Sequence, residues 1–101
     1  MTDKEKMVMD KILAKGSNFN FNKLDLTKTW EQNAEHLEGG KFYAFPDVRD
    51  YGCGMDKQAV RGVFGALSKK GMIEVWREDG IDWLMIGQSE FNNIVKEYAG
   101  L

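Results

Sequence analysis

The chain is poor in residues that form disulfides, metal sites and rigid turns. Its 101 residues include one cysteine (Cys53), one histidine (His36) and one proline. A single cysteine excludes an internal disulfide, and one cysteine with one histidine cannot supply the ligands of an ordinary zinc site. No apolar run approaches the roughly 20 residues that a membrane-spanning helix needs. We therefore expect a soluble single domain with no metal, no other cofactor and no membrane partner, stabilised by its own core.

An excess of basic charge is also missing. Lys and Arg total 14 against 16 Asp and Glu, a net charge of −2, and the pI is about 5.4. Strong non-specific binding of nucleic acid usually depends on a basic surface, so this balance counts against it but leaves a local basic patch open. The N-terminal residues carry mixed charges with no long apolar run behind them, which excludes a signal peptide and favours a cytoplasmic protein.

No set of residues indicates catalysis. The sequence has no combination of nucleophile, base and orienting group, and no glycine loop of the kind that holds phosphate. Asp47, Asp50 and Asp56 cluster in sequence, but without the spacing of a calcium loop they fit caps and solvated charge better. His36 on the polar side of a helix and Cys53 in a glycine-flanked turn fit structural roles. We expect that the protein is not an enzyme.

Apolar residues recur at intervals of three and four in several segments, which is the spacing of one helix face. With capping residues and C-terminal glycines as boundaries, helices are predicted over about residues 3–15, 26–38, 47–51, 56–70 and 89–99. Thr2 and Glu5 form a capping box for the first helix, and Ser89 is the expected cap of the last. The alternating run 17–22 is an edge strand or an ordered loop, and KFYAF at 41–45 is a strand or a buried connector.

The helix predicted over 56–70 has a narrow apolar stripe. This stripe consists of Val60, Val63, Phe64 and Leu67. Asp56 is a good N-cap and Gly71 ends the helix. Gly62 and Gly65 lie inside it, where each costs roughly 1 kcal/mol relative to alanine. Such a cost indicates close approach by another backbone, either a neighbouring helix, which we favour, or DNA.

Residues 73–86 predict a β-hairpin, because Asp79-Gly80 favours a two-residue turn. That turn pairs Arg77 with Asp82, Trp76 with Trp83, Val75 with Leu84 and Ile73 with Ile86. The core face then carries Ile73, Val75, Leu84 and Ile86, and the outer face carries Glu74, Trp76, Trp83 and Met85. Opposed tryptophans on an outer face are costly unless something covers them. We expect a helix of the protein itself as the cover, for which the N-terminal segment is a candidate; the alternative is a homodimer or another partner.

The order of helix, tight turn and hairpin over about residues 46–86 resembles winged helix-turn-helix domains. The matching residues are Gly54-Met55-Asp56, Val60, Phe64, Leu67 and Gly71-Met72-Ile73. The segment 46–54 is about two residues longer than the usual spacing of that family. The resemblance implies an α+β, mainly helical fold with a small antiparallel β-hairpin wing and an extra N-terminal helix. It implies one domain over 1–101, with an extension at 1–24 and a winged-helix core at 25–100, whose first helix we take to be 26–38 rather than 3–15.

The resemblance also implies roles for charged residues. The helix at about 56–70 would be a recognition helix in the major groove of double-stranded DNA. The residues that would contact bases or phosphates are Lys57, Gln58, Arg61, Lys69 and Lys70. The implied function is that of a DNA-binding transcription regulator, working as a homodimer through a terminal helix.

The expected wing argues for a different function. Its tip carries three carboxylates (Glu78, Asp79 and Asp82) against one arginine, and phosphate is repelled there. The alternative is therefore a winged helix that binds protein and not DNA. Its contact residues on the outer face of the wing would be Trp76, Trp83 and Met85.

Overall fold

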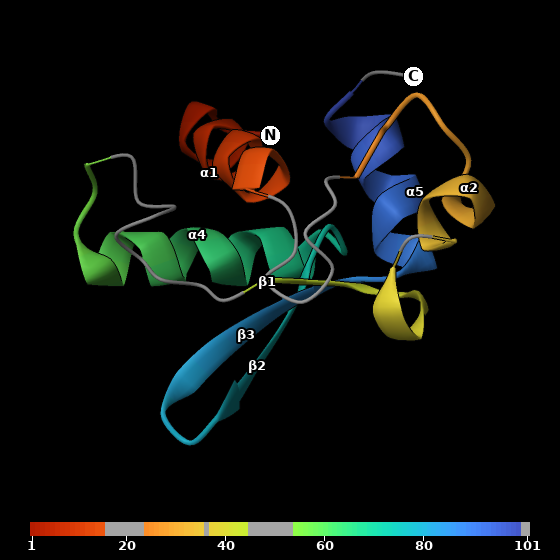
Figure 1. Ribbon diagram of the computed structural model, residues 1–101. Coiled ribbons are helices and arrows are strands. Elements are labelled where there is room, and N and C mark those ends of the chain that lie inside the picture. The colour runs from red at the N-terminus through yellow and green to blue at the C-terminus, as the bar shows by residue number, and fades with distance from the viewer. Residues whose placement is uncertain (16–23, 36, 45–53, 100–101) are drawn as a thin grey trace.

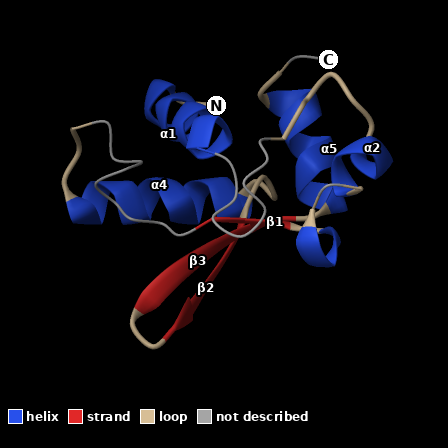
Figure 2. Ribbon diagram, viewed as in Figure 1, coloured by secondary structure: helices blue, strands red, loops and turns tan. Residues whose placement is uncertain are grey.

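The computed structural model describes residues 1–15, 24–35, 37–44 and 54–99. The helices are α1 (Asp3–Lys15), α2 (Trp30–Ala34), α4 (Lys57–Lys69) and α5 (Gln88–Glu97), with one 3₁₀ turn at Glu38–Gly40. The strands are β1 (Phe42–Ala44), β2 (Glu74–Glu78) and β3 (Ile81–Ile86). Figure 1 shows α1 lying on α4 and α2 beside α5, while Figure 2 shows the β2–β3 hairpin extending away from the helices. The fold is α+β, as the sequence predicts, with about half of the described residues helical.

Helix α1 forms where the sequence predicts it and packs on α4 (Figure 1). The Glu5 amide donates to Thr2 Oγ1 at 3.1 Å, and the Thr2 amide donates to Glu5 Oε1 at 2.7 Å, which completes the expected capping box. Val8, Met9 and Ile12 are fully buried. Burial of a large aliphatic side chain contributes about 1.5–3 kcal/mol, so α1 is a substantial part of the core.

Helix α4 also matches its prediction closely. Asp56 is its N-cap, and Asp56 Oδ1 accepts a hydrogen bond from the Ala59 amide at 2.8 Å. The predicted stripe is buried: Val60, Val63, Phe64 and Leu67. Gly71 follows the helix with φ +71°, and its carbonyl accepts a hydrogen bond of 2.9 Å from Asn93 Nδ2 of α5. The end of α4 is thereby fixed to α5.

The predicted helix over 26–38 is wrong in its extent, because α2 covers five residues. Thr29 Oγ1 accepts from the Gln32 amide, and Gln32 Oε1 accepts from the Thr29 amide, a capping box that starts the helix at Trp30. Asp25 forms a local turn with Thr27 before this cap. The ring of Trp30 lies 5.5 Å from that of Phe91, which joins α2 to α5. Among the described helices, α1 makes the extensive contact with α4.

The hairpin has the predicted register. Trp76 pairs with Trp83 and Val75 with Leu84, and the turn residues have positive φ, 53° at Asp79 and 78° at Gly80. Positive φ at both positions is the type I′ pattern that Asp-Gly favours. Ile73 precedes β2, so it is outside the ladder although it is buried.

Strand β1 adds a third strand that the hairpin prediction lacks. It pairs antiparallel with β3, Phe42 opposite Ile86 and Tyr43 opposite Met85, which gives the order β1-β3-β2. The run at 41–45 was expected to be either a strand or a buried connector, and residues 42–44 form a strand. Met85 lies opposite Glu74, on the outer face where the sequence predicts it, but it is 8% exposed and so offers little surface to a partner.

The last helix begins before the predicted cap Ser89. Its N-cap is Gly87, whose amide donates to Glu90 Oε1 at 2.8 Å, while the Ser89 hydroxyl donates to Glu90 Oε2. No helix in the described ranges is long and apolar enough to cross a membrane. The predictions for 17–22 and 47–51, and for His36, Cys53, Asp47 and Asp50, lie outside the described residues.

Candidate nucleic-acid interface

The outer face of α4 carries the polar residues that the resemblance assigned to DNA. Lys57, Gln58 and Lys69 are exposed, and Arg61 is partly exposed. Lys57, Gln58 and Arg61 lie within the first five positions of the helix, so the structure brings them together at its N-terminal end. Lys69 lies in the last turn, where a cation also suits the negative end of the helix dipole.

Two glycines make the middle of this face flat. A Cβ atom added at Gly62 or Gly65 would have no neighbouring heavy atom within 4 Å in the described part of the chain. We expected a neighbouring helix to lie close to these glycines. Among the described residues, that expectation is wrong. Both glycines are exposed, so the α4 backbone at these points is open to a ligand.

Beside Gly65 a cleft of about 300 Å³ separates α4 from β2. Its lining residues are Arg61, Phe64, Gly65, Ser68, Val75 and Arg77. Two cationic side chains, one from each element, therefore border the same cleft, and Ser68 of α4 lines it as well. Arginine at such a position suits bidentate contact with phosphate oxygens.

Arg77 is the charged residue of this cleft to which the sequence assigned no binding role. The signal for it is the alternation of side chains along a strand. Val75 and Arg77 share one face of β2, and Val75 pairs with buried Leu84, so Arg77 continues the face that packs toward α4. Arg77 lies on the α4 side of the hairpin and pairs across the ladder with Asp82, whereas Glu74 and Glu78 are on the other face.

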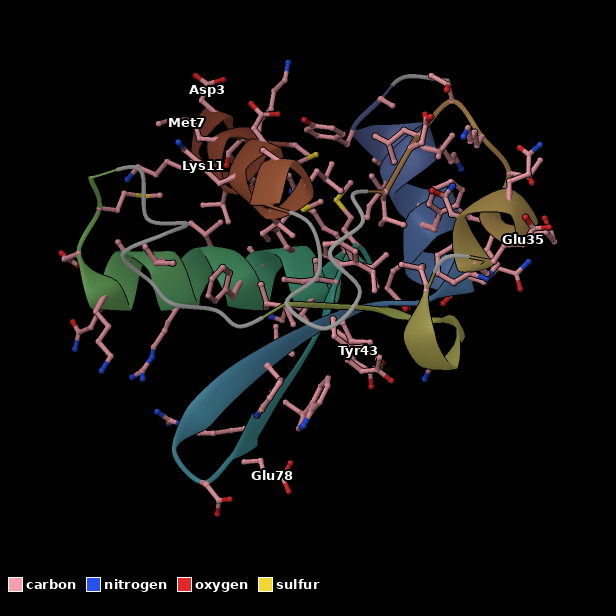
Figure 3. All side chains as sticks on the ribbon, viewed as in Figure 1. Asp3, Met7, Lys11, Glu35, Tyr43 and Glu78 are labelled. Atoms are coloured by element: carbon pink, nitrogen blue, oxygen red, sulfur yellow. The ribbon has the colours of Figure 1, made fainter. Side chains whose placement is uncertain are left out.

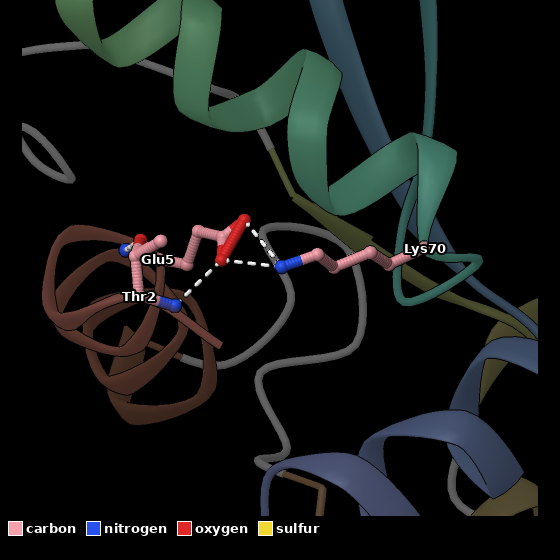
Figure 4. Close-up of polar contacts among 3 residues, drawn as sticks. All are labelled: Thr2, Glu5 and Lys70. Carbon is pink, nitrogen blue, oxygen red and sulfur yellow. Dashed lines mark hydrogen bonds and ion pairs between the residues drawn. The ribbon is translucent and has the colours of Figure 1, made fainter.

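Lys70, another residue that the resemblance assigned to DNA, forms an ion pair within the fold. Its ammonium donates to Glu5 Oε1 at 2.6 Å and Oε2 at 2.9 Å, as Figure 4 shows. Glu5 is 4% exposed, and the hydrogen bonds from Lys70 and the Thr2 amide hold the pKa of its carboxyl below the ordinary value. Lys70 thus forms an ion pair that joins the end of α4 to α1, and its DNA contact stays a prediction.

The tryptophans of the hairpin stack on each other. The Trp76 and Trp83 ring centroids are 6.0 Å apart with an interplanar angle of 12°, and both rings are partly exposed. Tyr43, labelled in Figure 3, meets Trp76 edge-on at 6.3 Å and 84°. A strand residue therefore packs on Trp76. Helix α1, the described part of the N-terminal segment that was a candidate cover, packs on α4.

Carboxylates surround this aromatic surface. Glu74, Glu78 and Asp79 are exposed on β2 and its turn. In the described residues no group of three or more His, Cys, Asp or Glu is arranged to hold a metal ion. No protein-family model matches the chain, and no curated protein or solved structure matches it either.

Proposed function

We propose that the protein is a winged-helix transcription regulator that binds double-stranded DNA through the outer face of α4. The passage from α4 through the positive-φ turn at Gly71 into the β2–β3 hairpin supports the winged-helix interpretation. The third strand and the additional helix α1 are compatible with it. Lys57, Gln58 and Arg61 are the residues that would contact bases or phosphates in the major groove.

The two exposed glycines on α4 are the observation that carries this proposal. A glycine inside a helix costs roughly 1 kcal/mol relative to alanine, and no contact within the described residues explains either position. A DNA backbone that lies against Gly62 and Gly65 would explain both. The arginines beside the α4–β2 cleft would then lie next to phosphate.

Charge decides the orientation of the complex. Exposed Glu78 and Asp79 at the hairpin tip repel phosphate, so the tip points away from the duplex in this proposal. Contact then depends on α4 and the α4–β2 cleft. Few cations take part, so we expect a shallow dependence of affinity on salt, about one counterion for each Lys or Arg that contacts phosphate. Homodimerisation, which would supply a second copy of the face, is part of the proposal.

A gel-shift assay with mixed duplexes at low and moderate salt tests the charged residues. Lys57→Ala and Arg61→Ala are each expected to weaken binding about fivefold to a hundredfold and to reduce the salt slope by about one. Lys11→Ala on the exposed side of α1 (labelled in Figure 3) is the matched control and leaves binding unchanged. Equal affinities in all three variants contradict the proposal, and light scattering on the same samples measures the oligomer mass.

The glycines allow a test in which stability and binding move in opposite directions. Gly62→Ala and Gly65→Ala are each expected to stabilise the fold by about 0.5–1 kcal/mol, because helix propensity rises and the new methyl group meets no atom. DNA binding is nevertheless expected to fall at least about tenfold, since the methyl groups hold the backbone away. Thermal melts and gel shifts measure the two effects. Stabilised variants that bind DNA as well as the wild type would refute this geometry.

A second candidate function is a protein-interaction module that uses the outer face of the hairpin. The stacked and partly exposed rings of Trp76 and Trp83 favour it, since paired aromatic side chains are frequent anchors of protein interfaces. In this case Trp76→Ala lowers partner binding or oligomer mass without unfolding the domain. Retained mass and retained partner binding in a folded Trp76→Ala variant would reject this candidate.

A further inference from the structure

Strand β2 presents one polar and aromatic stripe on the face that does not pack toward α4. The stripe consists of Glu74, Trp76 and Glu78, which alternate along the strand and therefore point to the same side. Neighbours in the stripe are about 7 Å apart along the strand. Trp83 of β3 stacks on Trp76 and Tyr43 of β1 meets it edge-on, which leaves Trp76 partly exposed. Both carboxylates are exposed. An indole with a carboxylate on each side is a recognisable chemical pattern.

The pattern is complementary to a cation. An indole face attracts a guanidinium or ammonium group through its ring quadrupole, with tryptophan the strongest of the aromatic residues. A carboxylate one step along the strand accepts hydrogen bonds from the same group, and the planar guanidinium of arginine can stack and donate together. Phosphate and acidic peptides are repelled by the same two carboxylates.

The position of β2 in the sheet indicates the form of the ligand. In the order β1-β3-β2, β2 is an edge strand among the described strands. Side chains of an extended segment alternate as those of β2 do, so such a segment lying along this edge repeats its contacts every second residue. Lys41 lines the same hollow as Glu74 and lowers the negative charge at that end. The stripe is therefore most negative around Glu78, next to exposed Asp79.

We propose that the Glu74–Trp76–Glu78 stripe binds an arginine-bearing extended segment of a partner protein. One guanidinium stacks on Trp76 and donates to Glu78, and a second cation two residues along the segment lies against Glu74. The proposal rests on the second candidate function and identifies its ligand class. It is independent of DNA binding, because α4 is on the opposite side of the hairpin from the stripe.

The probe is a blocked peptide, Thr-Arg-Thr-Arg-Thr, titrated into the full-length isotope-labelled chain. Its matched controls are the same peptide with glutamine or with glutamate in place of both arginines. The readout is the NMR signal of the indole N–H groups. The signals of Trp76 and Trp83 are expected to shift with the arginine peptide, while the signal of Trp30, whose ring packs on Phe91, stays in place.

Substitutions that remove charge but keep shape distinguish specific recognition of the peptide from non-specific binding. The double variant Glu74→Gln/Glu78→Gln keeps the shape of the stripe and is expected to weaken binding of the arginine peptide about tenfold. Glu35→Gln/Glu97→Gln removes the same charge from exposed sites just after α2 and at the end of α5 and leaves affinity unchanged. Figure 3 labels Glu35 and Glu78, which lie at separate ends of the molecule. Trp76→Leu, which keeps an apolar side chain, is expected to remove the arginine preference over glutamine.

Several results would overturn the proposal. These are no shift of the Trp76 indole with the arginine peptide, equal binding of the arginine and glutamate peptides, or equal affinity of the Glu74→Gln/Glu78→Gln variant and the wild type. A dimer that closes over this face and excludes the peptide also overturns it. The same variants are also tested in the gel-shift assay. Only the α4 substitutions are expected to weaken DNA binding there, so the failure of one proposal can be told from the failure of the other.

Discussion

At the scale of single residues, the carboxylate of Glu5 joins the first turn of α1 to the end of α4. It is 4% exposed, and its ion partner is 65 positions away in sequence. Local patterns correctly indicate that Glu5 caps α1 and that Lys70 suits the end of α4. They contain no information about which lysine faces a carboxylate across the fold. For this reason the sequence treats Lys69 and Lys70 alike, whereas the structure separates them.

The two adjacent lysines provide a matched experiment. Lys70→Ala leaves the Glu5 carboxylate without its ion partner and is expected to destabilise the fold by about 1–2 kcal/mol. This is less than for a fully buried pair, because the Lys70 side chain is 45% exposed. Lys69→Ala should change stability by less than about 0.5 kcal/mol. Urea unfolding at neutral pH measures both, and equal losses would mean that the ion pair contributes nothing.

The same pair has a pH dependence of defined sign. Lys70 lowers the pKa of Glu5 in the fold, so the stabilisation is fully present above the unfolded-state pKa of glutamate, about 4.3. It is lost as the pH falls through the lower folded-state value. The stability difference between the wild type and Lys70→Ala is therefore expected to shrink as the pH falls below about 4.

At the scale of elements, the correct predictions are those that depend on residues close together in the sequence. The α4 boundaries and the hairpin register depend on Asp56 and on Asp79-Gly80, which act within a few residues, and both are correct. The apolar period that predicted helix α2 begins at Leu26. The helix itself starts only at Trp30, because the capping box at Thr29 fixes its first turn. The register places Met85 opposite Glu74 as predicted, but Met85 is buried beside Tyr43 of β1, a strand that the hairpin prediction does not contain.

One substitution, glycine to alanine, should have opposite effects in two elements. Gly80 has φ +78°, and Gly62 has helical backbone with open space around it. Gly80→Ala forces an L side chain into the left-handed region and is expected to destabilise the fold by about 1 kcal/mol. Gly62→Ala is expected to stabilise it by a similar amount. Thermal melts of both variants suffice, and shifts of the same sign would contradict the assigned turn geometry.

At the scale of the whole molecule, α1 joins the common core instead of extending from it. Val8, Met9 and Ile12 belong to one cluster with Val60, Leu67 and Ile94. The contacts among α1, α4 and α5 link sequence positions up to 88 apart, as in the hydrogen bond from the Tyr98 hydroxyl to Asp10. The proposed DNA-binding face and the proposed arginine-binding stripe are thus carried by one cooperative unit, and a loss at either is interpretable only when unfolding has been measured.

The hydrogen bond between Tyr98 and Asp10 is expected to make the stability of this unit depend on pH in alkaline solution. Burial, reinforced by the hydrogen bond to Asp10, raises the pKa of Tyr98 to about 12. A raised pKa means that stability is unaffected below the unfolded-state value, about 10, and is lost as the pH rises toward the folded-state value. Tyr98→Phe removes the titrating group and one hydrogen bond, at a cost of about 1 kcal/mol near neutral pH.

The two proteins should therefore converge in alkaline solution. Wild-type stability, measured by urea unfolding, is expected to fall more steeply than that of Tyr98→Phe between about pH 10 and 12. Absorbance titration of the folded protein provides the control, since the variant should lack the phenolate that appears near pH 12. Parallel stability curves would show that Tyr98 ionises equally in the folded and unfolded chains. The hydrogen bond to Asp10 would then contribute no proton-linked stability, and α1 would be held by its apolar side chains and the Glu5–Lys70 pair.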